Sequence, residues 1–162
     1  MTISELLAKM IRFSEGNIHD IDHLIRVWTY ARAIGELEGL DPETQYVLEA
    51  AAITHDIACP LCREKYGNTD GKRQEAEGAP MVEAFLADSG MDRETLARVV
   101  YLVAHHHTLT NVEGIDYQIL IEADYIANAS ECGYPKGNME NALRTIIKTK
   151  SGAELIRSIF RL

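Results

Sequence analysis

Apolar residues recur at intervals of three and four along almost the whole chain, and this spacing constrains the fold more than any other feature. Residues that far apart lie on one face of an α-helix, so each such run predicts an amphipathic helix. Strand signals are scarce, because alternating β-branched runs are few and no Asn-Gly or Asp-Gly turn joins two of them. The sequence therefore predicts an all-α protein.

Breaks between these runs divide the chain into separate helices. Gly39 ends one helix, and Asp41 with Pro42 begins the next as N-cap and first-turn proline. The Pro, Cys, Gly, Asn and charged residues between 57 and 71 predict a loop of functional length. We expect one compact domain over residues 1–162, a bundle of about seven or eight helices. The expected helices cover about residues 3–13, 19–38, 42–56, 72–87, 93–105, 117–131, 139–149 and 153–160.

Composition and charge limit the partners of such a bundle. Hydrophobic residues make up 46% of the chain and charged residues 25%, the balance of a folded globular protein. No apolar run reaches the ~18 residues of a membrane span, and the first residues lack the features of a signal peptide. We therefore expect a cytoplasmic protein with no membrane partner, which could form a homodimer. The net charge of −9 argues against a nucleic-acid polymer as partner, whereas a bound metal would still allow a small anion.

The three cysteines do not describe a disulfide framework, because their number is odd and no secretory signal precedes them. Cys59 and Cys62 have the spacing of a redox or zinc motif. A redox motif would follow a strand, and a zinc knuckle would need a second pair. We therefore interpret Cys59 and Cys62 as ordinary reduced thiols in preference to a redox or zinc motif.

The six histidines fall in three places: residues 19 and 23, residue 55, and residues 105–107. In a chain rich in acidic residues, this clustering indicates a divalent metal site. His19 and His23 share one helix face. His55 and Asp56 would diverge by about 100° on a regular helix, so one ion can take both only where the helix ends, which the sequence predicts just after Asp56. A histidine favoured by the helix dipole is the alternative for His55 and for the cluster at 105–107.

Asp124 lies in the middle of an apolar helical stretch, residues 119–127. A buried carboxylate without a partner is costly, so this side chain should be paired or bound to a metal. A metal and a structural salt bridge both satisfy that requirement.

Together these residues resemble the HD superfamily of metal-dependent phosphohydrolases. The stretch from His23 to Val27 is similar to the HxxRV opening of the family. The stretch from Ala50 to Ile57 is similar to its signature His-Asp doublet, and residues 122–124 to its closing Ala-Asp element. Similarity continues at residues 74–79, 104–107 and 148–152, so the match runs in order over most of the chain.

The resemblance implies an all-helical bundle with a divalent metal near its centre. Its ligands would be His23, His55, Asp56 and Asp124. Some members bind a second ion through a histidine on the fourth expected helix and a later histidine pair; here Gln74 stands at the first position, and His105 and His106 match the pair. One ion is therefore the preferred expectation and a second is possible. Nitrogen and oxygen donors together suit Fe, Mn, Zn, Co or Ni better than Mg.

The function that the resemblance implies is hydrolysis of a small phosphorylated substrate, a nucleotide or another phosphomonoester, by attack of metal-activated water. Asp56 would bind the ion and orient the water, and His105 or His106 would protonate the leaving oxygen or bind phosphate. The candidate substrate-binding residues are Arg26, Lys65, Lys72 and Arg73. A salt bridge would explain Arg26 equally well, and ordinary solvated charges would explain the three others.

Two functions of other classes remain open. One is a catalytically weak regulatory module that binds metal and nucleotide. The other is a helical interaction protein whose histidines are structural.

Overall fold

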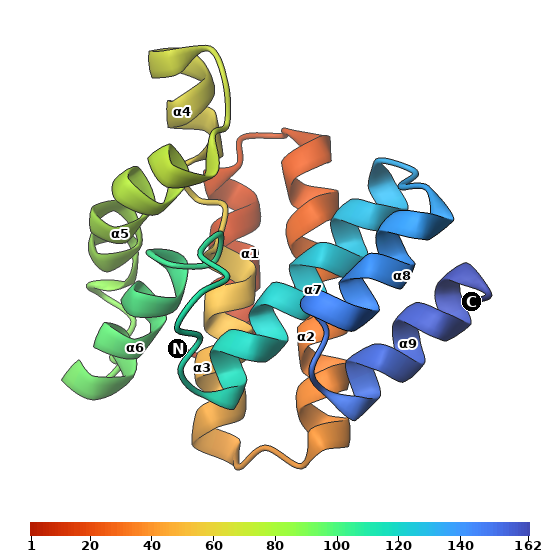
Figure 1. Ribbon diagram of the computed structural model, residues 1–162. Coiled ribbons are helices and arrows are strands. Elements are labelled where there is room, and N and C mark those ends of the chain that lie inside the picture. The colour runs from red at the N-terminus through yellow and green to blue at the C-terminus, as the bar shows by residue number, and fades with distance from the viewer.

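The structure, a computed structural model, describes all 162 residues and contains helices without any strand (Figure 1). The prediction of an all-α fold is therefore confirmed. In chain order the nine helices are α1 (Ile3–Phe13), α2 (Ile18–Glu38), α3 (Pro42–Thr54), α4 (Cys59–Tyr66), α5 (Gly71–Leu86), α6 (Arg93–Val103), α7 (Ile115–Glu131), α8 (Lys136–Thr145) and α9 (Lys150–Phe160).

Several helices begin and end at the capping residues that the sequence predicts. Asp41 and Asp92 are N-caps, and each side chain accepts hydrogen bonds from two backbone N–H groups of the following first turn. Gly39 ends α2 with a φ of 75°, a left-handed conformation that favours glycine. These local signals place α2, α3 and α6, the helices that carry or precede the histidines.

The prediction of a loop between residues 57 and 71 is wrong, because Cys59–Tyr66 forms α4. Pro60 lies in its first turn, where a backbone N–H has no intrahelical acceptor, so proline begins this helix instead of preventing it. Gly67 ends the helix with a φ of 71°. In Figure 1, α4 projects from the upper left of the bundle.

Three helices, α2, α3 and α7, pack together at the centre of the molecule, with α5 and α6 on one side and α8 and α9 on the other (Figure 1). One cluster of 30 buried apolar residues fills the space between the helices, and it contains no residue of α4. Three fully buried alanines, Ala50 to Ala52, allow the helices on both sides to approach α3 closely. None of the helices combines the length and the apolar character needed to cross a membrane.

Candidate metal centre

The four residues expected to bind a metal lie together, although they come from three separate parts of the chain. Nε2 of His23, on α2, lies 3.2 Å from Nε2 of His55, which directly follows α3. The same His23 atom lies 3.5 Å from Oδ2 of Asp56 and 3.2 Å from Oδ1 of Asp124, on α7. His55 Nε2 lies 3.6 Å from Asp56 and 3.7 Å from Asp124. The backbone turns at the end of α3, so the adjacent His55 and Asp56 face one point.

These separations fit one shared ion. Two donor atoms about 2.1 Å from a metal are about 3.0 Å apart at a right angle and about 3.4 Å apart at a tetrahedral angle. Two of the five donor separations, both 3.2 Å, lie in this range, and the other three, at 3.5–3.7 Å, exceed it by at most 0.3 Å. A mixed set of imidazole nitrogens and carboxylate oxygens suits a transition metal. The residues present therefore fit a divalent ion.

Both histidines have their other ring nitrogen engaged, which leaves Nε2 free for a ligand. His55 Nδ1 lies 2.8 Å from the carbonyl oxygen of Ala52, and His55 is completely buried. His23 Nδ1 lies 3.0 Å from Oε2 of Glu131. Since a carbonyl or carboxylate accepts the N–H at Nδ1, these contacts keep a proton on Nδ1 and leave Nε2 as the nitrogen that binds a metal in the neutral ring.

Two residues that support the donors were missed in the sequence. Glu131 orients His23, and Asn128 donates a hydrogen bond of 2.7 Å to Oδ1 of Asp124. Asp124, Asn128 and Glu131 are spaced by four and three residues, so they form a polar stripe along one face of α7. That spacing was a signal from which both supporting residues could have been predicted.

The histidine cluster after α6 divides in an unexpected way. His106 and His107 are the two histidines of the cluster that could bind a metal, because one ring nitrogen of each and a carboxylate oxygen of Asp56 all lie within 4.8 Å of one another. His106 Nε2 lies 3.4 Å from Asp56 Oδ1. Nε2 of His106 and Nε2 of His107 are both buried without a hydrogen-bond partner. These two nitrogens and Asp56 form a second, smaller set of donors beside the first.

His105, expected beside His106 in the site, lies apart from both sets of donors. Its Nδ1 lies 2.7 Å from the carbonyl oxygen of Tyr101, and its ring stacks on the Tyr101 ring at a centroid distance of 4.2 Å. The chain has left the regular helix after Val103, so the direction of each histidine depends on a turn and no longer on helical period.

Gln74 lies near the second set, at the position where a further histidine would be expected. Its amide donates to the carbonyl oxygen of Thr69 at 2.7 Å, and its oxygen accepts from the Cys59 thiol at 3.2 Å. The two polar ends of Gln74 are thus already engaged within the protein. The start of α5 also passes close to the second set, since a Cβ on Gly71 would lie 2.8 Å from Cγ of His107.

The pKa values of several donor side chains are strongly shifted in the protein without an ion. Burial by itself lowers the pKa of His23, but the carboxylates of Asp124, Asp56 and Glu131 outweigh burial and raise that pKa to about 9. Burial opposes ionisation of Asp56, yet His55 and the neighbouring imidazoles hold its pKa well below the usual value. Burial lowers the pKa of His107 to about 4, so this ring is neutral at pH 7. A metal that binds His23 must therefore displace a proton.

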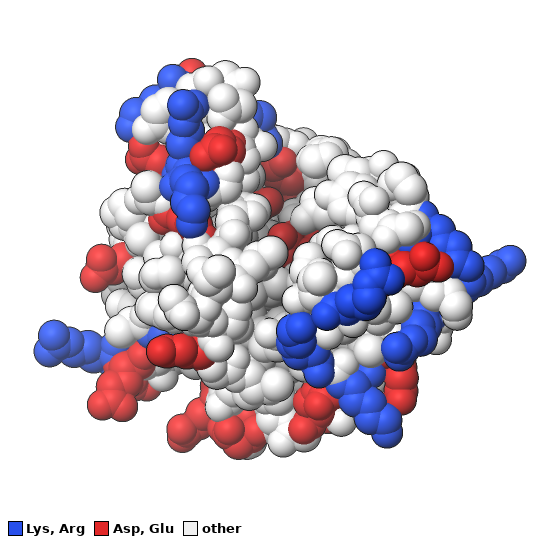
Figure 2. Space-filling model, in the orientation of Figure 1, with Lys and Arg blue, Asp and Glu red and all other residues white.

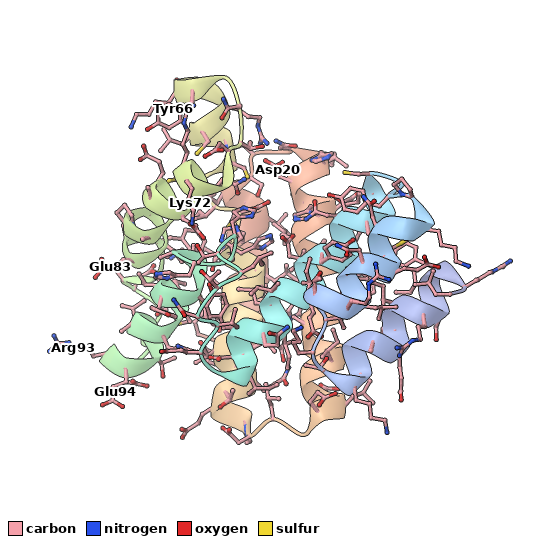
Figure 3. The ribbon with its side chains drawn as sticks, in the orientation of Figure 1. Asp20, Tyr66, Lys72, Glu83, Arg93 and Glu94 are labelled. Atoms are coloured by element: carbon pink, nitrogen blue, oxygen red, sulfur yellow. The ribbon has the colours of Figure 1, made fainter.

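The basic residues expected to bind substrate lie outside the donor cluster. Arg26 is half-exposed, and its Nε lies 3.8 Å from Oε1 of Glu131, the carboxylate that orients His23. The other three contact neighbouring side chains: Lys65 donates a hydrogen bond to Glu77, and Lys72 donates to Glu75 and Thr108. The guanidinium of Arg73 lies over the ring of Tyr66. Figure 3 shows Tyr66 on α4 and Lys72 near the start of α5.

Glu122 has a structural role. It is completely buried and accepts hydrogen bonds from the backbone N–H groups of Lys148 and Thr149 and from the Thr149 hydroxyl. It thereby anchors the segment that precedes α9. Cys59 and Cys62 are buried free thiols on α4, and burial raises the pKa of both.

The donor cluster lies at the bottom of a hollow in the surface. Figure 2 shows acidic side chains inside a depression between the lobe that contains α4 and the opposite part of the molecule, and basic side chains over α4 at its rim. A polar pocket of about 170 Å³ opens on His23, Asp56 and Asp124. Small molecules can therefore reach the donors from solvent.

Comparison with known proteins agrees with this geometry. The model of the HD domain matches residues 20–132, a segment that contains all six donors. The crystal structure of a predicted HD superfamily hydrolase from an uncultured Thermotogales bacterium is similar to this fold, with a TM-score of 0.69 and 22% sequence identity. The similarity covers 98% of this chain and 84% of that one. No curated protein sequence matches the chain. The family match extends over more than half of the chain, which therefore belongs to the HD-domain family.

Proposed function

We propose that this chain is a metal-dependent phosphohydrolase that acts on a small phosphorylated substrate, a nucleotide or another phosphomonoester. One observation carries the proposal: two imidazole nitrogens, 3.2 Å apart, each lie within 3.7 Å of a carboxylate oxygen of Asp56 and of Asp124, at the base of an open pocket. Both Nδ1 atoms are engaged elsewhere, which leaves the Nε2 atoms free for the ion. Membership of the HD-domain family supports the same function.

His23, His55, Asp56 and Asp124 would hold the ion. Such an ion lowers the pKa of a water molecule and offsets negative charge on a phosphoryl group. In the reaction, a bond forms between the water oxygen and phosphorus and the bond from phosphorus to the alcohol oxygen breaks. One proton of the water ends on the alcohol, and inorganic phosphate is the second product.

Asp56 and His106 are the residues that would manage this proton. Asp56 keeps its negative charge and can accept a hydrogen bond from the attacking water. His106 lies 3.4 Å from Asp56, and although burial alone would lower its pKa, the contact with Asp56 raises it. A protonated His106 can give its proton to the leaving oxygen. This assignment replaces His105, whose ring faces Tyr101.

The second set of donors, Asp56, His106 and His107, supports a two-ion form of the same site. Its two free imidazole nitrogens favour that form, while the engaged amide of Gln74 disfavours it. We prefer one ion. Metal analysis of protein purified without a histidine tag decides between them, because one ion per chain supports the single-ion form and two ions support the other.

The experiment that tests the function is a screen of nucleotides and sugar phosphates for phosphate release with Mn, Fe, Co, Ni, Zn or Mg. We expect turnover with a transition metal, reduced at least about a hundredfold in His55→Ala and Asp56→Asn, since loss of a ligand exceeds the 10–100-fold cost of losing an outer partner. Glu83→Gln is the matched control, because Glu83 points outward from α5 (Figure 3). Unchanged turnover in both ligand variants would contradict the function.

A further inference from the structure

A second cavity adjoins the polar pocket. The polar pocket contains four of the six donor residues. The neighbouring pocket, of about 390 Å³, contains three of them and five apolar or aromatic side chains, after which we call it the apolar pocket. The two pockets share five lining residues, so they form one continuous cleft with the donors near its middle: Thr69, Gln74, His107, Asp124 and Asn128.

The apolar pocket can take an organic group, because five of its eleven lining residues are apolar or aromatic. Five apolar or aromatic side chains line it, Leu109, Ile121, Tyr125, Tyr134 and Ile146. The Tyr125 and Tyr134 rings meet edge to face at a centroid distance of 5.9 Å. A cavity of about 180 Å³ continues past Leu109, Ile121 and Ile146. The other six residues that line the apolar pocket are polar and include His106, His107 and Asp124. Pockets of this size that combine apolar side chains with polar groups bury most of a small organic molecule.

The polar pocket differs in carrying most of the charged side chains of the cleft. Four carboxylates line it, and Arg63 is the sole lysine or arginine that lines either pocket. Arg63 comes from α4 and pairs with Asp20 of α2, which Figure 3 shows at the end of α2 that faces α4. Asp20 is its one hydrogen-bonding partner, and its side chain is 40% exposed. A guanidinium has five N–H donors, so most of them remain free for an anion.

We propose that the substrate lies along this cleft in one orientation, an inference that rests on the phosphohydrolase function. The phosphoryl group lies over the donors, where Arg63 contacts its oxygen atoms. The alcohol part lies in the apolar pocket and carries a planar ring system the size of a nucleoside base. Arg63 thereby binds the part that all substrates share, and the apolar pocket selects among them.

This arrangement predicts two different kinetic effects. A contact to the phosphoryl group is common to every phosphomonoester, so removing Arg63 reduces kcat/KM for all of them by the same factor. A contact to the ring exists only in substrates that have one, so removing an apolar wall reduces kcat/KM for those alone.

Adenosine 5′-phosphate and ribose 5-phosphate are suitable probes, because they share the phosphoester and differ by the base. We expect wild-type kcat/KM to favour the adenosine compound at least tenfold, which corresponds to about 1.4 kcal/mol. Leu109→Ser and Tyr134→Ala should each remove most of that preference and leave ribose 5-phosphate unaffected. Leu109 is 54% exposed, so its substitution leaves the core intact even if Tyr134→Ala folds poorly. Arg63→Gln should lower kcat/KM about 10- to 100-fold for both compounds.

The control for Arg63 is Arg93→Gln, since Arg93 is exposed and points away from the bundle in Figure 3. Arg63→Gln should also keep the metal affinity of the wild type, because Arg63 is no ligand. Equal kcat/KM for the two compounds, or equal losses on both when Leu109 is changed, would overturn the orientation while leaving the hydrolase function standing.

Absence of turnover with every metal would contradict the hydrolase function itself. Calorimetric titration of the metal-loaded protein with both compounds then still tests the cleft. Tighter binding of adenosine 5′-phosphate that Leu109→Ser removes supports the orientation, and equal affinities overturn it.

Discussion

Glu131 offers the sharpest test of the metal centre, because it touches a proposed ligand without being one. Its Oε2 lies 3.0 Å from Nδ1 of His23 and thereby sets the ring so that Nε2 lies 3.2 Å from His55 Nε2. Loss of such a carboxylate partner typically costs 10–100-fold in metal affinity, or about 1.4–2.7 kcal/mol. Glu131→Gln keeps an acceptor oxygen and should lie at the low end. Glu131→Ala also leaves the Arg26 guanidinium, 3.8 Å from the carboxylate, without its partner and should lie at the high end.

The assay is a competition between the protein and a chelator of known affinity for Mn or Zn. Glu140→Gln is the control, an exposed glutamate on α8 that makes no ion pair. The expected order of affinity is wild type and Glu140→Gln, then Glu131→Gln, then Glu131→Ala. If Glu131→Ala binds the ion within about twofold of the wild type, Glu131 does not position a ligand, and the assignment of His23 loses its support.

Three further predictions concern stability. Leu48→Ala should lower the free energy of unfolding by about 2–5 kcal/mol in urea titration, because Leu48 is completely buried in the core; a loss below about 1 kcal/mol would show that the site collapses around the cavity. Gly71→Ala should cost about 1–3 kcal/mol by the same measurement, since its Cβ would meet His107 Cγ at 2.8 Å and that atom is too near the backbone to move freely; a more stable variant would contradict the close approach. Burial alone would raise the pKa of Glu75, but its hydrogen bonds from Lys72 and Thr108 outweigh burial and lower that pKa below 4.5. The stability that the charged Glu75 contributes is therefore complete above pH 4.5 and is lost as the pH falls through the lowered pKa. The difference between wild type and Glu75→Gln should therefore shrink below pH 4.5, and a constant difference would be evidence against a charged Glu75.

Most of the fold could be predicted because its signals are local. The apolar spacing and the caps at Asp41 and Asp92 depend on residues close in sequence, and the structure contains every helix they predict. α4 escaped prediction because it is only eight residues long, begins with a proline in its first turn and has no side-chain cap. Packing against α5 and the pair of Arg63 with Asp20 hold it in place, and neither contact is visible in a local pattern.

The candidate site could likewise be predicted only in part. The four proposed ligands were identified through the resemblance to the HD superfamily, since residue type and helical context alone left a helix-dipole histidine or a structural salt bridge as alternatives. Choosing between His105 and His107 required the path of the turn after α6, which follows no period. Arg63 was overlooked because it belongs to the helix that the sequence did not predict.

The separateness of α4 has a consequence for how the cleft behaves in solution. No residue of α4 belongs to the main core, so this helix can unfold locally at a lower free energy than α2, α3 or α7. Amide hydrogen exchange should therefore be faster in Cys59–Tyr66 than in the central helices. Such local unfolding would open one wall of the polar pocket while the bundle stays folded, and the packing of α4 on α5 and its ion pair with α2 both oppose it.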